Sequence, residues 1–153
     1  MRIIKAELSD LPAVLTLQRL AYQSEAQLVD DFSIPPLTQT LEELTADFGA
    51  GIILIAVEQS RPTEIAGSVR GRFSGNTLHI GRLIVNPSRQ NRGIGTALLR
   101  GIEALYPRMR YELFTSDRSV KNLSLYIKNG YREFKREPLN KRVNLVFLEK
   151  HGS

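Results

Sequence analysis

A segment in the middle of the chain has the residue types and spacing of a binding loop for an anionic group. An apolar, strand-like run reaches a break at Asn86-Pro87-Ser88, and a turn with two glycines, Gly93 and Gly95, leads directly into an amphipathic helix. The first turn of a helix leaves amide N–H groups without partners, and the helix dipole places about half a positive charge there. Because glycine lacks a Cβ, a ligand oxygen can approach these amides closely. With Arg89 and Arg92 expected to add mobile positive charge, the segment predicts a cradle for a phosphate or diphosphate.

Other phosphate-binding motifs fit this segment less well. The chain has no Gly-x-x-x-x-Gly-Lys-Ser/Thr, which excludes the P-loop of nucleoside triphosphatases. The run from Gly93 to Leu98 lacks the third small residue of Gly-x-Gly-x-x-Gly, which counts against a dinucleotide-binding fold. A structural alternative stays open at this point, in which the two glycines only shape the turn between a strand and a helix.

The run from Val85 to Gly95, VNPSRQNRGIG, resembles the signature V-x-P-x-x-Q/R-x-x-G-x-G/A of the GNAT family of N-acetyltransferases. The resemblance implies that loop amides wrap the pyrophosphate of acetyl-CoA and that the preceding strand pairs with its pantetheine arm. It also implies that an amide near Ile84 or Val85 polarises the thioester carbonyl. The cofactor-binding residues implied in this way are Leu83, Ile84, Val85, Gln90, Asn91, Arg92, Gly93, Ile94, Gly95 and Thr96.

A second segment, from Ser119 to Tyr131, resembles the family's later motif N-x-x-A-x-x-L-Y-x-K-x-G-F. The resemblance makes Tyr126 the general acid, whose phenol protonates the departing CoA thiolate. It also brings Ser119 and Asn122, on the same helix, to the pantetheine or the phosphates. The sequence departs from the motif at both positions, because Ser119 stands in place of the commoner Asn and Asn122 in place of Ala. Taken without the resemblance, Tyr126 fits a core tyrosine with its hydroxyl at the rim.

Acetyl transfer to an amine needs the neutral amine, which makes a general base useful. A lysine side chain, with a pKa of about 10.4, is roughly 0.1% neutral or less at pH 7, whereas an α-amino group is about 10% neutral. His79 stands eleven positions before Gln90, where the histone-acetylating branch of the family has a glutamate. A histidine serves as a base directly or through water, although His79 also fits a packing role between Leu78 and Ile80. The other candidate bases are Glu25, Asp30, Asp31 and Glu112.

The composition excludes several other chemistries. The chain has no cysteine, which rules out disulfides, thiolate metal sites, iron–sulfur clusters and a cysteine-bound acyl intermediate. The two histidines, His79 and His151, have no spacing that gathers three or four ligands, so we predict no metal. The N-terminus lacks the apolar core of a signal peptide, and no apolar run approaches the roughly 20 residues of a membrane span. These features predict a cytoplasmic protein without a membrane partner.

Charge is distributed unevenly along the chain. Residues 1–67 carry 4 Lys and Arg against 10 Asp and Glu, whereas residues 68–153 carry 17 against 6, for a net charge of +5. The basic part predicts an anionic partner, either nucleic acid or a phosphate-rich cofactor. Residues that could form a nucleic-acid surface are Arg108, Arg110, Arg118, Lys121, Lys128, Arg132, Lys135 and Arg136. The acidic part, which in the family forms one wall of the acceptor cleft, favours a cationic amine or polyamine instead.

The elements that must position these residues are predicted from hydrophobic periodicity and turn residues. Helices are expected at about 11–28, from Thr38 or Thr40 to about 49, at 94–106 and at 119–128. Strands are expected at 2–5, 52–58, 64–73, 77–85, 109–115, 131–135 and 143–148, with short loops at 59–62 and 74–76 joining an antiparallel meander. This order predicts an α/β chain with a mixed sheet and helices packed on it. The resemblance implies the GNAT acyl-CoA N-acyltransferase fold, with a central, mostly antiparallel sheet flanked by helices.

We therefore expect one N-acetyltransferase domain, residues 1–150, with a mobile tail at 151–153. The predicted reaction transfers the acetyl group of acetyl-CoA directly to a primary amine of a small molecule, peptide or protein in a ternary complex, because no cysteine can carry the acyl group. The alternative is a non-catalytic module that senses acyl-CoA or binds nucleic acid through the basic C-terminal surface. The sequence leaves the acceptor and the oligomeric state, a homodimer included, open.

Overall fold

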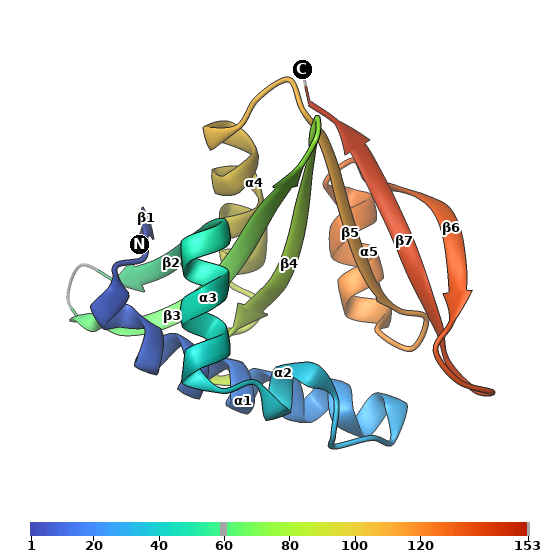
Figure 1. Cartoon of the computed structure of the whole chain (residues 1–153), viewed down its shortest axis with the longest axis horizontal. Coiled ribbons are helices and arrows are strands. Elements are labelled where there is room, and N and C mark those ends of the chain that lie inside the picture. Colours follow the sequence, from blue (N-terminus) through green and yellow to red (C-terminus); the bar gives the residue numbers. More distant parts are fainter. Residues whose placement is uncertain (59–60, 153) are drawn as a thin grey trace.

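All strands of the described chain join one sheet in the order β1-β2-β3-β4-β5-β7-β6 (Figure 1). The computed structural model describes residues 1–58 and 61–152, the side chains of 61–63 excepted. The strands are β1 (Arg2–Lys5), β2 (Ile52–Glu58), β3 (Arg61–Ser74), β4 (Thr77–Val85), β5 (Arg110–Ser116), β6 (Arg132–Pro138) and β7 (Asn144–His151). Neighbouring strands run antiparallel except β4 and β5, which are parallel. The predicted mixed, mostly antiparallel sheet and its central meander are confirmed.

Helices cover both faces of the sheet. They are α1 (Leu11–Val29), α2 (Pro35–Thr38), α3 (Leu41–Ala50), α4 (Ile94–Leu105) and α5 (Val120–Lys128), with short 3₁₀ turns η1 (Leu8–Asp10) and η2 (Pro87–Arg89). In Figure 1, α1 and α3 lie in front of the strands, while α4 and α5 lie behind them. Among the described helices, none combines the length and the apolar character that crossing a membrane requires.

The continuous apolar run of β2 is explained by this two-sided cover. Leu54 and Ala56 face the core beneath α4 and α5, whereas Ile53 and Ile55 face a second core beneath α1 and α3. Successive side chains of a strand point to opposite faces, so a strand buried on both faces needs apolar residues at every position. The sheet is therefore held rigidly on both sides of the strands that lead to the glycine-bearing turn.

The helix signals in the sequence are confirmed with small differences. Thr40 caps α3, because its hydroxyl accepts a hydrogen bond from the Glu43 amide at 3.1 Å and the Glu43 carboxylate accepts one from the Thr40 amide at 2.9 Å. At α1 the N-cap residue is Asp10, but its side chain makes no capping bond to α1; it accepts from the Glu7 amide at 2.7 Å and belongs to η1. On α4 the predicted apolar face is buried at its start, but Leu105 is exposed.

Three segment boundaries differ from those expected. The predicted break after α1 contains the short helix α2, because Pro35 at its start has φ already set for a helix. Strand β3 begins at Arg61 rather than at residue 64, and Gln59 and Ser60 of the predicted 59–62 loop lie outside the described residues. Strand β7 extends through His151, and the Gly152 amide donates to the Met109 carbonyl at 2.8 Å, where a mobile tail was expected.

Candidate active site

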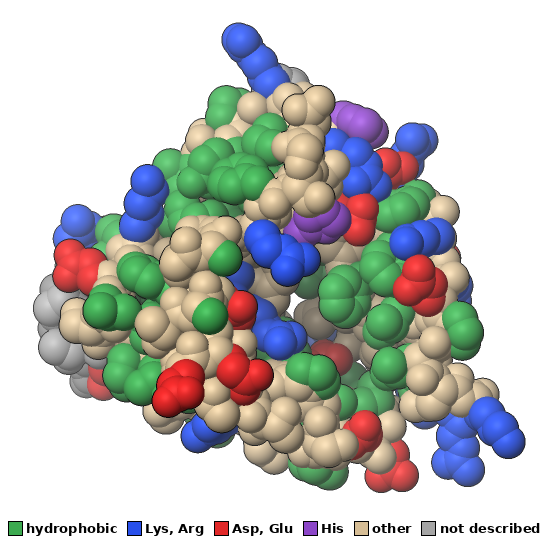
Figure 2. All heavy atoms as spheres, in the orientation of Figure 1, with side chains coloured by type: hydrophobic (Ala, Val, Ile, Leu, Met, Phe, Trp, Pro, Cys, Tyr) green, Lys and Arg blue, Asp and Glu red, His purple; other side chains and the backbone are tan. Residues whose placement is uncertain are grey.

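The parallel strands β4 and β5 separate after a short stretch of pairing. In the described chain, Thr77, Leu78 and His79 pair with residues 110–112, and the two strands then diverge (Figure 1). We call the space between residues 80–85 of β4 and residues 113–116 of β5 the β4–β5 opening. Figure 2 shows the surface hollowed between the two halves of the molecule. Because β4 has no strand partner along this edge, its amide and carbonyl groups are free to pair with an extended ligand.

A bulge in β4 creates this divergence. The pairing of β3 with β4 shifts between Ser68 and Arg70, and Arg82 on the opposite strand has a φ of 49°. Before the bulge, Leu78 and Ile80 face the α4 core, and after it Leu83 and Val85 pack on that same core. One inserted residue reverses the alternation and bends the strand, which is the usual effect of a β-bulge. The predicted strand residues 83–85 therefore lie on the free edge, at the divergent end of β4.

The turn after β4 presents the start of α4 to the same end of the opening. The Asn86 side chain accepts from the Ser88 amide at 3.0 Å, and Asn91 and Gly93 have φ values of 64° and 77°. In α4 the Ala97 amide donates to the Gly93 carbonyl at 3.0 Å, and the three amides before it, those of residues 94–96, have no helical acceptor. Gln90, Asn91, Arg92 and Gly93 are exposed. The structure thus brings the exposed residues 90–93 to the N-terminus of α4, where the amides of residues 94–96 have no helical acceptor.

The two glycines of the turn have different reasons to be glycine. A Cβ on Gly93 would meet no described heavy atom within 4 Å, but its positive φ is one that residues with a side chain rarely adopt. A Cβ on Gly95 would lie 3.2 Å from Cδ2 of Leu125, so a side chain there would press on α5 where it packs against α4. The sequence predicted that the missing Cβ of both glycines lets a ligand oxygen approach the loop amides. In the structure this reason fits Gly93, whereas the reason at Gly95 is packing against α5.

Arg89 does not supply the mobile positive charge expected of it. Its guanidinium forms an ion pair with Glu58 and donates to Glu64 at 2.9 Å, and its side chain is 15% exposed. The two carboxylates neutralise it and hold η2 against the β2–β3 end of the sheet. Arg92 is exposed, so of the two arginines only Arg92 fits the predicted role.

Tyr126 lies on α5 and is 5% exposed. Burial raises the pKa of its phenol well above the ordinary value of 10, and the nearby Tyr22 and Glu25, both on α1, raise it further. Its ring packs against that of Tyr131, with centroids 6.1 Å apart. Tyr126 therefore keeps its proton at neutral pH, as a general acid must, and it also fills part of the core. The position of Tyr126 is compatible with a general acid and with a core tyrosine.

Glu25 connects the first helix to α5. The Ser119 hydroxyl donates to the Glu25 carboxylate, and the Asn122 side-chain amide donates to it at 3.4 Å. The two α5 residues predicted to contact the cofactor thus have a carboxylate partner within the chain, and their cofactor contact stays a prediction. The same bonds place Glu25 near Tyr126, a proximity that the sequence, in which they are 101 positions apart, did not indicate.

His79 lies where the pairing of β4 with β5 ends. Its Nδ1 is 3.6 Å from Oε2 of Glu112, its direct neighbour on β5. Glu112 also accepts a hydrogen bond from Arg110 at 2.7 Å. The His79 side chain is 35% exposed, which is compatible with a base that solvent can reach and with packing at the edge of the sheet. A carboxylate at Nδ1 orients the ring and leaves Nε2 available.

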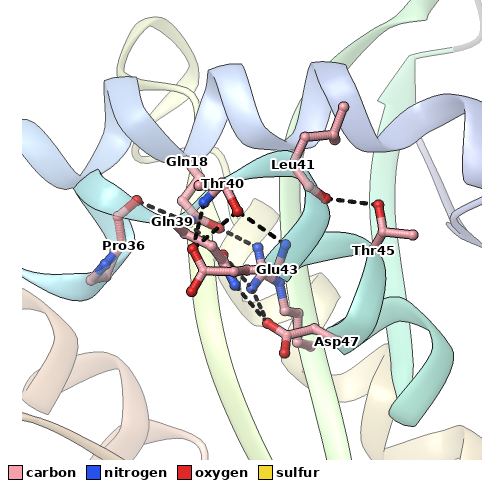
Figure 3. Close-up of polar contacts among 9 residues, drawn as sticks. Gln18, Pro36, Gln39, Thr40, Leu41, Glu43, Thr45 and Asp47 are labelled. Atoms are coloured by element: carbon pink, nitrogen blue, oxygen red, sulfur yellow. Dashed lines mark hydrogen bonds and ion pairs between the residues drawn. The ribbon is translucent and has the colours of Figure 1, made fainter.

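A polar network missed in the sequence fixes α1 and α3 against the sheet. Figure 3 shows Gln18 from α1 and Asp47 from α3 with Gln39, which precedes α3, at the centre. The Gln18 side-chain amide donates to Gln39 Oε1 at 3.0 Å, and that of Gln39 donates to Asp47 at 2.8 Å. Arg70 from β3 completes the network, with its Nη1 3.1 Å from Asp47. Buried polar groups need partners, but no local pattern indicates which distant residues provide them.

Half of the basic residues named above as a possible nucleic-acid surface have carboxylate partners: Arg110, Arg132, Lys135 and Arg136. Arg110 lies 2.7 Å from Glu112 and 3.0 Å from Glu149. Carboxylate partners also lie within 4 Å of Arg132, Lys135, Arg136 and Lys150. Figure 2 shows Lys and Arg side chains on this face with acidic side chains between them. No group of three or more His, Asp or Glu side chains in the described chain is arranged to hold a metal ion.

Comparison with known proteins agrees with this geometry. Residues 49–133 match the sequence profile of a family described as "Acetyltransferase (GNAT) domain". Among curated proteins, no sequence matches this chain. Solved structures that share the fold include the PaiA N-acetyltransferase from Thermoplasma acidophilum in complex with coenzyme A, at 18% identity and a TM-score of 0.76, covering 98% of each chain.

Two further structures extend this likeness. The ribosomal-protein-S18-alanine N-acetyltransferase from Escherichia coli has 16% identity and a TM-score of 0.79, covering 99% of this chain and 94% of its own. An aminoglycoside 6'-N-acetyltransferase complexed with coenzyme A has 18% identity and a TM-score of 0.77, covering 99% of this chain and 97% of its own. At these identities the likeness establishes the fold.

Proposed function

Because this chain belongs to the GNAT acetyltransferase family, we propose that it transfers the acetyl group of acetyl-CoA to a primary amine of a small molecule, peptide or protein in a ternary complex. The observation that carries the proposal is the placement of amides without helical acceptors at the α4 N-terminus, next to the edge of β4 that is unpaired in the described chain. An anion fits the first and an extended chain fits the second. With no cysteine in the chain, transfer is direct.

The residues present fit coenzyme A at two places. The amides of residues 90–96 would hold the pyrophosphate, and Gly93 leaves the approach to them clear. Hydrogen bonds to a charged group are worth about 1.5–3 kcal/mol each, so a few of them support micromolar affinity. The free edge at Leu83–Val85 would pair with the amide-bearing pantetheine arm. Two structures with the same fold carry coenzyme A, which supports this assignment.

When bound, acetyl-CoA supplies an activated acyl group to a neutral amine. The amide of Ile84 or Val85 stabilises negative charge on the carbonyl oxygen. The Tyr126 phenol donates its proton to the sulfur as the C–S bond breaks and the new N–C bond forms. His79, oriented by Glu112 at 3.6 Å, takes the proton that the amine gives up. Glu25 is the competing base, because it is the carboxylate beside Tyr126.

Calorimetric titration tests the cofactor part of this proposal. We expect one acetyl-CoA to bind per chain with micromolar affinity, and coenzyme A to bind at the same site. A thiol-release assay with a panel of amino acids, peptides, aminoglycosides and polyamines should then reveal amine-dependent turnover. A protein that binds no coenzyme A thioester, or that binds one and acetylates no amine while retaining nucleic-acid affinity, would contradict it.

A His79→Gln variant tests the choice of base. We expect kcat/KM to fall about tenfold to a hundredfold, since general-base help is lost. His151→Gln is the matched control, because His151 is 67% exposed at the end of β7; it should leave kcat/KM unchanged. If Glu25→Gln causes this loss and His79→Gln does not, Glu25 is the base.

A further inference from the structure

Two arginines lie close together on the sheet face that α1 and α3 cover. Arg70 on β3 pairs with Gly81, the residue next to Arg82 on β4. The two guanidinium groups repel one another: burial, and then the charge of Arg82, lower the pKa of Arg70 to about 10. Two neighbouring cations in a half-buried position are unfavourable unless an anion lies between or beside them.

Of these two arginines, only Arg70 has a carboxylate partner among the described residues. Arg70 donates to Gln39 at 3.0 Å and to Gln18, and its ion pair with Asp47 is 3.1 Å long. Its side chain is 10% exposed, and its buried Nε has no hydrogen-bond partner. Asp47 is half exposed at 49% and is the one carboxylate within ion-pair distance of Arg70 among the described residues. Arg70 is thus tied into the polar network of Figure 3 by its two terminal nitrogens.

Arg82 is a partly buried cation with no carboxylate partner among the described residues. In the described part of the chain, no carboxylate lies within 4.0 Å of its guanidinium, and its buried Nε has no hydrogen-bond partner. Its recorded partner is the neutral hydroxyl of Tyr22 on α1. Arg89 and Arg110, in contrast, each have two carboxylate partners. A partly buried charge without a counter-ion is costly, and a bound anion would remove that cost.

The backbone at Arg82 is unusual, because it lies at the bulge of β4. Its φ of 49° is in the left-handed region, which is unfavourable for a residue with a side chain. Bulges that turn one side chain in a new direction recur next to active sites. Tyr22, the hydrogen-bond partner of Arg82, is also close enough to Tyr126 to affect its charge. Arg82 and the proposed acid therefore both lie near Tyr22 of α1.

We propose, on the basis of the acetyltransferase function above, that Arg82 binds a carboxylate of the acceptor and that the acceptor is accordingly an amino acid or another small amine bearing a carboxylate. A guanidinium presents two parallel N–H donors that match the two oxygens of a carboxylate. Arg70, on the neighbouring strand, adds to the positive potential at this site, while its Nη1 and Nη2 groups donate to Gln18, Gln39 and Asp47. The acceptor amine then lies toward Tyr126 and Glu25.

The test compares matched acceptors in wild-type protein and in an Arg82→Asn variant. Asn tolerates the left-handed conformation better than most residues, so this variant removes the charge without adding strain. The acceptors are amino acids and their carboxamides. A second pair, O-phosphoethanolamine and ethanolamine, tests whether the site prefers a phosphate group; we call this pair the phosphate arm. We expect wild-type kcat/KM to favour the amino acids at least tenfold. Arg82→Asn should lose about tenfold to a hundredfold on amino acids and stay within about twofold on carboxamides.

Controls separate this inference from the proposed function. Arg100→Asn, on the exposed face of α4, should change neither set of acceptors. Arg82→Lys keeps a charge without the two-pronged geometry and should fall between wild type and Arg82→Asn. Equal wild-type rates on amino acids and carboxamides, equal losses on both in Arg82→Asn, or a preference for the phosphate arm would each overturn the proposal. Acetyl-CoA affinity should be the same in every variant.

An NMR binding measurement tests the anion site in the absence of acetyl-CoA. An equimolar mixture of amino acids should shift the Nε–Hε NMR signal of Arg82, whereas the same mixture of carboxamides should not. Absence of that shift overturns the carboxylate site whatever the cofactor result is. Absence of acetyl-CoA binding with the shift present would instead contradict the proposed function and leave the anion site standing.

Discussion

Replacement of Gly93 by aspartate is expected to weaken acetyl-CoA binding at least a hundredfold. Gly93 is the N-cap of α4, so a carboxylate there would lie where the helix amides and dipole favour an anionic ligand. The new charge would repel the pyrophosphate and compete for the same N–H donors. Calorimetric titration with acetyl-CoA measures the loss directly.

Gly75→Asp is the matched control for this variant. Gly75, in the turn between β3 and β4, has a φ of 60° against 77° for Gly93, and a Cβ at either position would meet no described heavy atom within 4 Å. Both substitutions therefore add the same charge and a similar backbone strain of about 1 kcal/mol. We expect similar losses of thermal stability and a loss of acetyl-CoA affinity at position 93 alone. Equal affinities in the two variants would contradict the assignment of the cradle.

The Tyr126→Phe variant is expected to lower kcat by about a hundredfold or more while acetyl-CoA affinity changes by less than about twofold. The substitution removes the proton that the leaving sulfur requires and keeps the ring that fills the core. Stopped-flow or steady-state measurement of thiol release, together with calorimetry, separates the two quantities. An unchanged kcat would leave Tyr126 with a packing role only.

The pH dependence of the wild type adds to this test. Burial raises the pKa of Tyr126 above its ordinary value of 10, so the phenol is still protonated at pH 9 to 10. A general acid is active below its pKa and inactive above it, so Tyr126 should cause no alkaline decline of kcat within that range. A decline that begins below pH 9 and is absent in Tyr126→Phe would contradict the shift.

Tyr131→Phe is the control for the loss of a buried hydroxyl. The Tyr131 hydroxyl donates to Glu103 at 2.8 Å, and its ring packs on that of Tyr126. Removing one such hydrogen bond costs about 1 kcal/mol of stability, and kcat should stay within about twofold of the wild type. A loss of kcat equal to that in Tyr126→Phe would show that packing, rather than proton transfer, explains both.

Local features of the sequence predicted most elements of the fold. Alternation and periodicity located the strands and the longer helices, because a side chain faces the core every second residue in a strand and every three to four in a helix. The start of α3 was predicted at Thr38 or Thr40, and the structure places it at Thr40, where a capping box with Glu43 lies within four residues. The exceptions, such as α2 and the extension of β7 to His151, lie where pairing or a short turn overrides a weak local signal.

The binding loop was also predictable, and for the same reason. The backbone at Asn86, Gly93 and the start of α4 depends on residue types within a few positions of one another. The resemblance to the GNAT signature extended this local prediction to a family, which the match over residues 49–133 confirms. The individual roles assigned to Tyr126 and His79 stay predictions for the variants described above.

What the sequence by itself determined is the set of elements and the loop that starts α4, because short-range backbone preferences are enough to specify both. Only the tertiary structure decided which charges are neutralised: Arg89 is paired with Glu58 and Glu64, while Arg82 has no carboxylate partner in the described chain. Such pairings join residues tens of positions apart, and they depend on how strands register and where helices dock. The sequence does not distinguish a charged residue whose partner lies within the fold from one whose partner is a bound substrate.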